Sequence, residues 1–183
     1  MRLKAVILEN FRSYRHKTRI EFGDMTAFIG RNDAGKSTVL EALAIFFDTG
    51  VVKLDRDDAN AYSGNSVVTI GCVFDVLPDE LVIDVSAETT LAQEYLVNAE
   101  GCFEIHKRYD VSASRISTRV SAVANHPTVT RGNDLLHLKN SDLKARAKDL
   151  GVDNLVDDLR SNPSLRKVIW EHFKQKGELQ LEE

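Results

Sequence analysis

The sequence predicts an α/β fold with a mixed sheet, an antiparallel β subdomain and helices at the C-terminal end. Three observations lead to this class. A short apolar run over residues 25–29 is followed by a glycine-containing turn and an amphipathic pattern over residues 37–47. Residues 67–123 are rich in β-branched and aromatic side chains, and helical periodicity dominates from residue 141 onward. The length suits one domain with its own hydrophobic core.

The first segments favour strands. Residues 3–8 are mostly apolar, and in residues 18–22 β-branched or apolar side chains alternate with charged ones, as in a half-exposed strand. We expect these two segments to pair as a hairpin. A turn then leads into residues 25–29, an apolar run that predicts a buried strand ending at Gly30.

A helix is predicted over residues 37–47, because its apolar side chains fall on one side, and Gly50 ends it. Residues 53–64 are polar and rich in turn formers, so they predict a connecting loop. The longest strand candidate covers residues 67–77, where Gly71 could mark a bulge.

The middle of the chain predicts antiparallel sheet, and the end predicts helices. Residues 96–110 have the pattern of a hairpin that turns at residues 99–101, and residues 115–123 continue the meander. The segments SDLKARAKDL, NLVDDLR and SLRKVIWEHF are helical in pattern, with breaks at Gly151 and Asn162-Pro163.

We therefore divide the chain into an N-terminal lobe, residues 1–133, and a helical segment, residues 134–183, which we expect to continue in a longer parent protein. The last helical segment spaces four apolar side chains on one face: Leu165, Ile169, Trp170 and Phe173. This face is either buried within the chain or, in a truncated chain, awaits a missing lobe or a partner subunit.

Composition excludes several classes of protein. The formal net charge is −4, so any contact with nucleic acid or an anionic membrane must come from a local patch. Cys72 and Cys102 stand alone, without a metal-binding spacing or a disulfide framework. No apolar stretch is long enough for a signal peptide or a membrane span, and we expect a cytoplasmic protein.

One motif stands above the rest of the sequence. Residues 30–37 read Gly-Arg-Asn-Asp-Ala-Gly-Lys-Ser, a full match to GxxxxGK[ST]. From the composition of this chain, a chance match anywhere along it is expected roughly 0.004 times for this pattern. The predicted strand before it and the helix after it are the context that a phosphate-binding loop requires.

The chemistry of this loop follows from its residues. Gly30 and Gly35 let the backbone wrap around a polyphosphate with its N–H groups pointing inward, and the following helix adds the partial positive charge of its N-terminus. Lys36 adds a full charge for the β- and γ-phosphates, and the Ser37 hydroxyl is suited to bind Mg²⁺. The sequence therefore predicts that ATP and Mg²⁺ bind here.

The residues around the loop resemble a known family. The segments Leu8-Glu9-Asn10-Phe11-Arg12-Ser13-Tyr14 and Phe28–Ser37, with Val39-Leu40-Glu41-Ala42-Leu43, are similar to the N-terminal lobe of the SMC and RecF type of ABC ATPase. The Asn-Asp-Ala centre of the loop looks most like the OLD-family ATPase-nucleases and the Gabija anti-phage ATPase. The resemblance is specific over residues 1–48 and implies a P-loop NTPase fold of the ABC head type.

The resemblance also implies which residues bind the nucleotide. Arg12 would reach the phosphates, with Ser13 beside it, although Phe11 and Tyr14 could instead be core residues around a solvated Arg12. Within the loop, Asn32 would shape the backbone. The full set implied to bind nucleotide is Arg12, Ser13, Gly30, Arg31, Asn32, Asp33, Ala34, Gly35, Lys36, Ser37 and Thr38.

The sequence departs from this family where catalysis is concerned. Such ATPases need a hydrophobic strand ending in Asp-Glu and a signature segment that a second subunit presents to the γ-phosphate, and neither is visible. Residues 81–84 read Leu-Val-Ile-Asp, but Val85 stands where the glutamate should follow. We therefore assign no catalytic residue and expect half of a composite ATP site, completed by a C-terminal lobe or by a second subunit in a dimer.

Two charged segments are weaker candidates. Asp55, Asp57 and Asp58 could bind a metal, but their turn-rich context favours a solvated loop. A basic strip could contact a DNA backbone, with Arg115 and Arg119 on one face of the sheet, or could be an ordinary solvent face. Its members are Lys107, Arg108, Arg115, Arg119 and Arg131.

The main expectation is the ATP-binding lobe of an SMC/RecF/OLD-like ATPase that acts in DNA repair or anti-phage defence. One alternative is a compact P-loop phosphotransferase, in which Asp33 or Asp84 would assist a small acceptor. Another is an interaction module that nucleotide regulates and that has no chemistry of its own.

Overall fold

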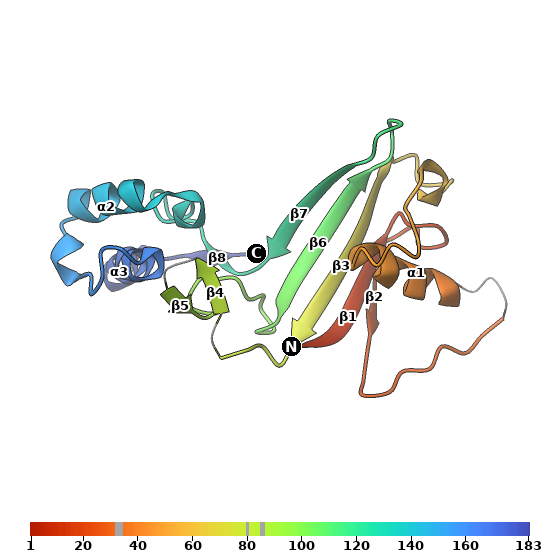
Figure 1. Ribbon diagram of the computed structural model, residues 1–183, viewed down its shortest axis with the longest axis horizontal. Coiled ribbons are helices and arrows are strands. Elements are labelled where there is room, and N and C mark those ends of the chain that lie inside the picture. Colours follow the sequence, from red (N-terminus) through yellow and green to blue (C-terminus); the bar gives the residue numbers. More distant parts are fainter. Residues whose placement is uncertain (32–34, 80, 85–86) are drawn as a thin grey trace. The chain divides into compact units, whose positions relative to one another are not determined.

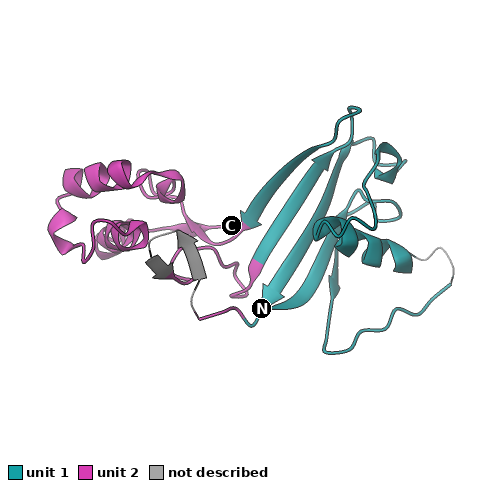
Figure 2. Ribbon diagram, viewed as in Figure 1, with its two compact units in different colours: residues 1–76, 104–122 teal, residues 77–103, 123–183 magenta. Residues whose placement is uncertain are grey.

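The computed structural model describes residues 1–31, 35–79, 81–84 and 87–183. Its residues cluster into two compact units, which are coloured separately in Figure 2. Unit 1 comprises residues 1–76 and 104–122, and unit 2 comprises residues 77–103 and 123–183. The predicted division into lobes at residue 133 is a functional division and stays a prediction.

Unit 1 is built on a five-stranded sheet with the strand order β2-β1-β3-β6-β7 (Figure 1). β1 is antiparallel to both of its neighbours, β2 and β3, which confirms the predicted opening hairpin. The strands are β1 (Arg2–Glu9), β2 (Thr18–Glu21), β3 (Val67–Asp75), β6 (Phe103–Asp110) and β7 (Ser117–Val123).

Helix α1 (Lys36–Phe46) packs on this sheet through β1 and β3. Of the side chains that the apolar spacing predicts on one side, Val39 and Phe46 are buried, whereas Leu40 and Phe47 are exposed. The Nζ of Lys107 on β6 donates to the Phe46 carbonyl at 2.7 Å and lies 5.0 Å from the centre of its ring. Burial of this apolar face, rather than helix propensity, holds α1 in place.

A short 3₁₀ helix, η1 (Arg56–Asp58), interrupts the loop that connects α1 to β3. The sequence suggested a bulge at Gly71 in β3. In the pairing of β1 with β3, however, Gly71 is in register with Ile7, and the irregularity falls between Leu3 and Ala5. Instead, the imidazole of His106 lies against Gly71, where a Cβ would come within 2.6 Å of the ring. The missing side chain makes room for a buried histidine.

The predicted buried strand at residues 25–29 is wrong. These residues form no strand, and Met25 and Ile29 are 93% and 94% exposed. A buried strand needs a neighbour on its hydrogen-bonding edge, and none of the described strands pairs with this segment. The apolar run that precedes the loop is therefore left on the surface of unit 1.

Unit 2 contains a cluster of helices and two small sheets. Its helices are η2 (Leu135–His137), α2 (Asn140–Asp149), η3 (Asp153–Leu155) and α3 (Asn162–Gln175). Its strands pair as β4 (Leu81–Asp84) with β5 (Ala87–Thr89), and β8 (His126–Pro127) with β9 (Leu181–Glu182). The segment NLVDDLR forms only the η3 turn, so the helix predicted there is wrong.

The core of unit 2 contains the apolar face of α3. Leu165, Ile169, Trp170 and Phe173 are all buried, so of the two expectations for this face, burial within the chain is confirmed. The Trp170 indole N–H donates to the carbonyl of Gly132 at 2.8 Å, which satisfies its polar edge inside the core.

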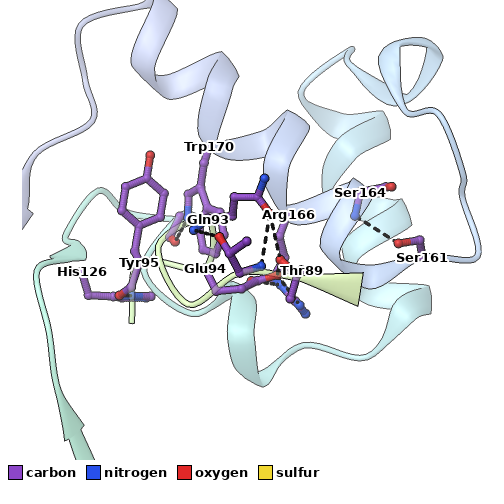
Figure 3. Close-up of polar contacts among 11 residues, drawn as sticks. Thr89, Gln93, Glu94, Tyr95, His126, Ser161, Ser164, Arg166 and Trp170 are labelled. Atoms are coloured by element: carbon purple, nitrogen blue, oxygen red, sulfur yellow. Dashed lines mark hydrogen bonds and ion pairs between the residues drawn. The ribbon is translucent and has the colours of Figure 1, made fainter. Parts of the chain in front are cut away.

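A buried ion pair joins α3 to the segment after β5 (Figure 3). Arg166 donates to Glu94 through Nε at 2.7 Å and through Nη2 at 3.0 Å, and Thr89 Oγ1 donates to the same carboxylate at 2.9 Å. Ser161 caps α3 by accepting from the Ser164 backbone N–H at 3.2 Å. These contacts place residues 89–94 against α3.

The hairpin predicted over residues 96–110 is half correct. β6 forms, but its neighbours in the sheet are β3 and β7, and residues 96–102 make a turn rather than a strand. The pairing of β6 with β7 confirms the predicted continuation of the meander into residues 115–123. The side chain of Asn98 accepts from the backbone N–H groups of Glu100 and Cys102, each at 3.0 Å. This local bonding competes with strand pairing.

Candidate nucleotide site

A cavity of about 530 Å³ opens at the N-terminal end of α1. We call it the α1 cavity. The turn that follows β1 and the first two turns of α1 supply its walls. The residues that line it are Arg12, Ser13, Gly35, Lys36, Ser37, Thr38 and Glu41.

Gly35 brings these two segments together. It precedes α1 with a left-handed φ of 83°, a conformation that favours glycine. A Cβ at this position would lie 2.8 Å from Ser13 Oγ and 3.1 Å from the Tyr14 hydroxyl. Tyr14 donates to the Gly35 carbonyl at 3.3 Å. The turn after β1 and the start of α1 can be this close only because Gly35 has no side chain.

The start of α1 gives the α1 cavity the character of an anion site. The first backbone N–H groups of a helix have no acceptor within the helix, and the helix dipole is positive at this end. Thr38 and Val39 are buried, whereas Ser37 is exposed. The Ser37 hydroxyl is a hard oxygen ligand that suits Mg²⁺.

Lys36 is held by its own loop. Its Nζ donates to the carbonyl of Gly30 at 2.9 Å and to that of Arg31 at 2.6 Å. The ammonium therefore lies against the first carbonyls of the predicted phosphate-binding loop. Asn32, Asp33 and Ala34 belong to the same predicted site and lie outside the described residues.

Arg12 is the second cation of the α1 cavity. Its Nε donates to Asp58 Oδ1 at 2.6 Å, and its Nη1 forms an ion pair with Glu41. Burial disfavours the charged guanidinium, but the hydrogen bonds with these two carboxylates outweigh burial and raise the pKa of Arg12. Because φ of Arg12 is 49°, its backbone is in the left-handed region, where a non-glycine residue is strained.

The loop around η1 holds Arg12 in this conformation. The Arg12 backbone N–H donates to the Asp58 carbonyl at 2.7 Å, and the Asn60 side chain donates to the Arg12 carbonyl at 2.5 Å. Asn10, which has φ of 54°, donates to the carbonyls of Asn65 and Val67. The loop and the turn after β1 therefore form one hydrogen-bonded structure.

Sequence reasoning missed Asp58 and Glu41 at this site. Asp58 was interpreted as part of a solvated loop, yet it is buried and contacts Arg12. One signal could have identified it, because Asp55 and Asp58 have the spacing of a capping box. In the structure, the side chain of each accepts from the backbone N–H of the other, at the start of η1. No local pattern singles out Glu41, because its importance comes from the fold around α1.

The predicted site residues therefore fall into three groups. Arg12, Ser13, Gly35 and the residues 36–38 line the α1 cavity. Gly30 and Arg31 do not line it, but their carbonyls accept from Lys36, which does. The remaining three, Asn32–Ala34, lie outside the described residues. Nucleotide binding by this set stays a prediction.

The predicted basic strip is not a single surface. The Lys107 ammonium donates to the Phe46 carbonyl. Arg131 belongs to unit 2, where it pairs with Asp149 at 3.2 Å. Arg115 precedes β7, so the alternation that would put it on the face of Arg119 does not apply. The three exposed cations of the strip within unit 1 are Arg108, Arg115 and Arg119.

Other candidate chemistry is sparse in the part of the chain that the structure describes. There, no three His, Cys, Asp or Glu side chains gather as a metal site would require. Asp84 ends β4 in unit 2, and Asp33 lies outside the described residues.

Burial raises the pKa of the Cys72 thiol to about 12, against a smaller opposing effect of Lys107, so this thiol stays protonated. Among the described helices, none has both the length and the hydropathy of a membrane span.

One comparison with known proteins agrees with the motif. The model of the family described as "AAA ATPase domain" matches residues 1–183. Among solved structures, the SMC head domain from Thermotoga maritima matches with 21% identity and a TM-score of 0.41. That match covers 67% of this chain and 39% of the other chain, so the chain spans well under half of that structure. No curated protein matches. Because the family model covers the whole sequence, the predicted P-loop ATPase fold is confirmed, and the chain belongs to the AAA ATPase domain family.

Proposed function

We propose that this chain binds ATP with Mg²⁺ in the α1 cavity and forms half of a composite ATPase site. The observation that carries the proposal is that two cations, Arg12 and Lys36, meet the N-terminus of α1 at one open cavity. A triphosphate is a polyanion, and converging cations with backbone N–H groups are what it needs. Family membership supports nucleotide as the ligand.

The residues of the α1 cavity fit the cofactor as well. Ser37 offers an exposed hydroxyl beside Lys36, one residue into α1. Mg²⁺, when bound with ATP, neutralises charge on the phosphates. The protein's own part would be to orient the phosphate chain, with Lys36 and Arg12 as its cationic contacts and the first backbone N–H groups of α1 as further donors.

The proposal includes a second lobe. ATP hydrolysis needs an oriented water and charge stabilisation on both sides of the γ-phosphate, and the α1 cavity supplies one side. The exposed apolar run at residues 25–29, directly before the loop, supports the idea that another strand covers it in the assembled protein. The partner would be a C-terminal lobe or a second ATPase subunit in a dimer.

We place this ATPase in the cytoplasm. The resemblance to SMC, RecF and OLD proteins implies a role in DNA repair or anti-phage defence. Arg108, Arg115 and Arg119 are the candidates for contact with a DNA backbone, because all three are exposed cations of unit 1. Such contacts recognise phosphate and not sequence, so binding would fall steeply with salt.

Isothermal titration calorimetry with ATP and Mg²⁺ tests nucleotide binding. We expect the chain to bind, and Lys36→Ala to weaken binding by about tenfold or more, since hydrogen bonds to charged groups contribute roughly 1.5–3 kcal/mol. Saturating ATP at a hundred times Kd should stabilise the chain by about 2.7 kcal/mol. Lys176→Ala, an exposed lysine after α3, is the matched control. No heat, no stabilisation and an unaltered Lys36→Ala variant would refute the proposal.

A further inference from the structure

Arg12 lies between two carboxylates whose surroundings differ. The Asp58 side chain is 9% exposed, whereas the Glu41 side chain is 34% exposed. Asp58 belongs to the loop around η1, and Glu41 belongs to the second turn of α1. One partner is therefore built into the protein interior, and the other faces the α1 cavity.

The ion pair of Arg12 with Asp58 is held by several hydrogen bonds at once. Both carboxylate oxygens are in use, since Oδ1 accepts from Arg12 Nε and Oδ2 accepts from the Asp55 backbone N–H at 2.8 Å. The Asp58 carbonyl also accepts from the Arg12 backbone N–H. Breaking the Arg12–Asp58 pair would leave a buried carboxylate without its cation, which costs far more than breaking an exposed pair.

The ion pair of Arg12 with Glu41 lies at the wall of the α1 cavity. Glu41 lines the α1 cavity and lies four residues after Ser37, so both side chains are on one face of α1. An anion at this position repels an incoming phosphate and also occupies the Nη1 of Arg12. A phosphate oxygen offers the same guanidinium an equivalent charge-assisted bond.

We propose that Glu41 occupies, on the Arg12 guanidinium, the position that a nucleotide phosphate takes when it binds. The phosphate then displaces the Glu41 carboxylate, while Asp58 keeps the guanidinium pointing into the α1 cavity. Glu41 is then a carboxylate that limits affinity, and Asp58 is a positioning residue. This inference rests on the proposed function, because it concerns the same cavity.

Titration of the full chain with AMP-PNP and Mg²⁺ tests the role of Glu41. We expect Glu41→Gln to bind about two- to fivefold more tightly, which corresponds to roughly 0.4–1 kcal/mol and lies within the range for solvent-accessible ion pairs. Arg12→Ala should bind about tenfold more weakly, and the gain from Glu41→Gln should vanish in the Arg12→Ala background. Asp48→Asn, which removes a charge just beyond the other end of α1, should have no effect.

Weaker binding by Glu41→Gln would overturn the inference. If the affinity fell only in the presence of Mg²⁺, the role of Glu41 would be to bind the metal. Unchanged affinity would overturn it too. If the parent chain binds AMP-PNP and both Lys36→Ala and Arg12→Ala weaken binding, but Glu41→Gln behaves like the parent, the inference fails and the proposed function stands. If nothing binds, both fail.

The role of Asp58 needs a readout that simple destabilisation would not give. We expect Asp58→Asn to weaken AMP-PNP binding severalfold, with no further loss in the Arg12→Ala background. Asp55→Asn removes the same charge from the same turn without touching Arg12, and it should leave affinity unchanged. In ¹⁵N-arginine spectra, the Arg12 Nε proton should stay protected from solvent exchange with and without nucleotide. Loss of that protection on binding would show that Asp58 is not the retained partner.

Discussion

Arg12 and Gly35 both adopt left-handed backbone conformations at the α1 cavity, for different reasons. Gly35 does so at little cost, because it has no Cβ, and its missing side chain makes room for Ser13 and Tyr14. Arg12 does so at a cost, which its bonds with Asp58 and Asn60 offset. Strain held by a surrounding network is a mark of sites that need one fixed geometry.

His106 gives unit 1 a pH dependence. Burial lowers the pKa of His106 from its ordinary 6.5; the hydrogen bond with Glu104 at 2.8 Å opposes this shift, and Lys17 and Arg108 add to it. The unfolded chain then binds more protons than the folded chain, so stability rises with pH. We expect the free energy of unfolding to fall as pH drops below about 6.5.

Urea unfolding at a series of pH values, followed by circular dichroism, measures this slope. His106→Gln should remove it above pH 5, because glutamine can bond with Glu104 and does not titrate. Asp75 and Asp110, whose pKa values hydrogen bonds lower from 3.8, act only below that range. A slope that survives in His106→Gln would assign the titration to another group.

At the scale of elements, the contacts that fix each segment come from far along the chain. The loop around η1 is joined to the turn after β1 by bonds that span more than forty residues. The segment after β5 is joined to α3 by the buried pair of Glu94 and Arg166. Both connections use polar groups, which fix geometry more sharply than apolar contacts do.

We expect Arg166→Met to destabilise unit 2 by about 3–5 kcal/mol, because it leaves the Glu94 carboxylate buried without its cation. Combining it with Glu94→Leu should recover most of the loss, since well-packed apolar replacements of buried pairs are often neutral or stabilising. Urea denaturation followed by tryptophan fluorescence suits the measurement, as Trp170 lies on α3. A loss of less than about 1 kcal/mol for Arg166→Met would mean that Glu94 finds another partner.

At the scale of the whole molecule, the proposed function makes the α1 cavity one side of a composite catalytic site. We expect steady-state ATP turnover by this chain to be near background, and to rise when a lobe that supplies the missing carboxylate and signature segment is added. A phosphate-release assay with Lys36→Ala as the control measures this. Robust hydrolysis by the chain alone that depends on Lys36 would contradict the composite site.

The sequence by itself determined the P-loop, the opening strands, α1, and the apolar face of α3, because each rests on a local period or a local motif. It placed Arg12 and Lys36 near one another only through resemblance. The prediction of a buried strand at residues 25–29 is wrong, because an apolar run shows only that a segment can be buried. It does not show whether a neighbouring strand is available to pair with it.

The tertiary structure alone decided what surrounds Arg12. Asp58 and Glu41 are 46 and 29 residues from it in the chain, and no period or spacing connects them. A charged side chain in a loop reads as solvated until the fold brings an opposite charge beside it. Ion pairs between distant segments depend on the packing of α1 and the loop around η1 against β1, and only the folded chain contains that information.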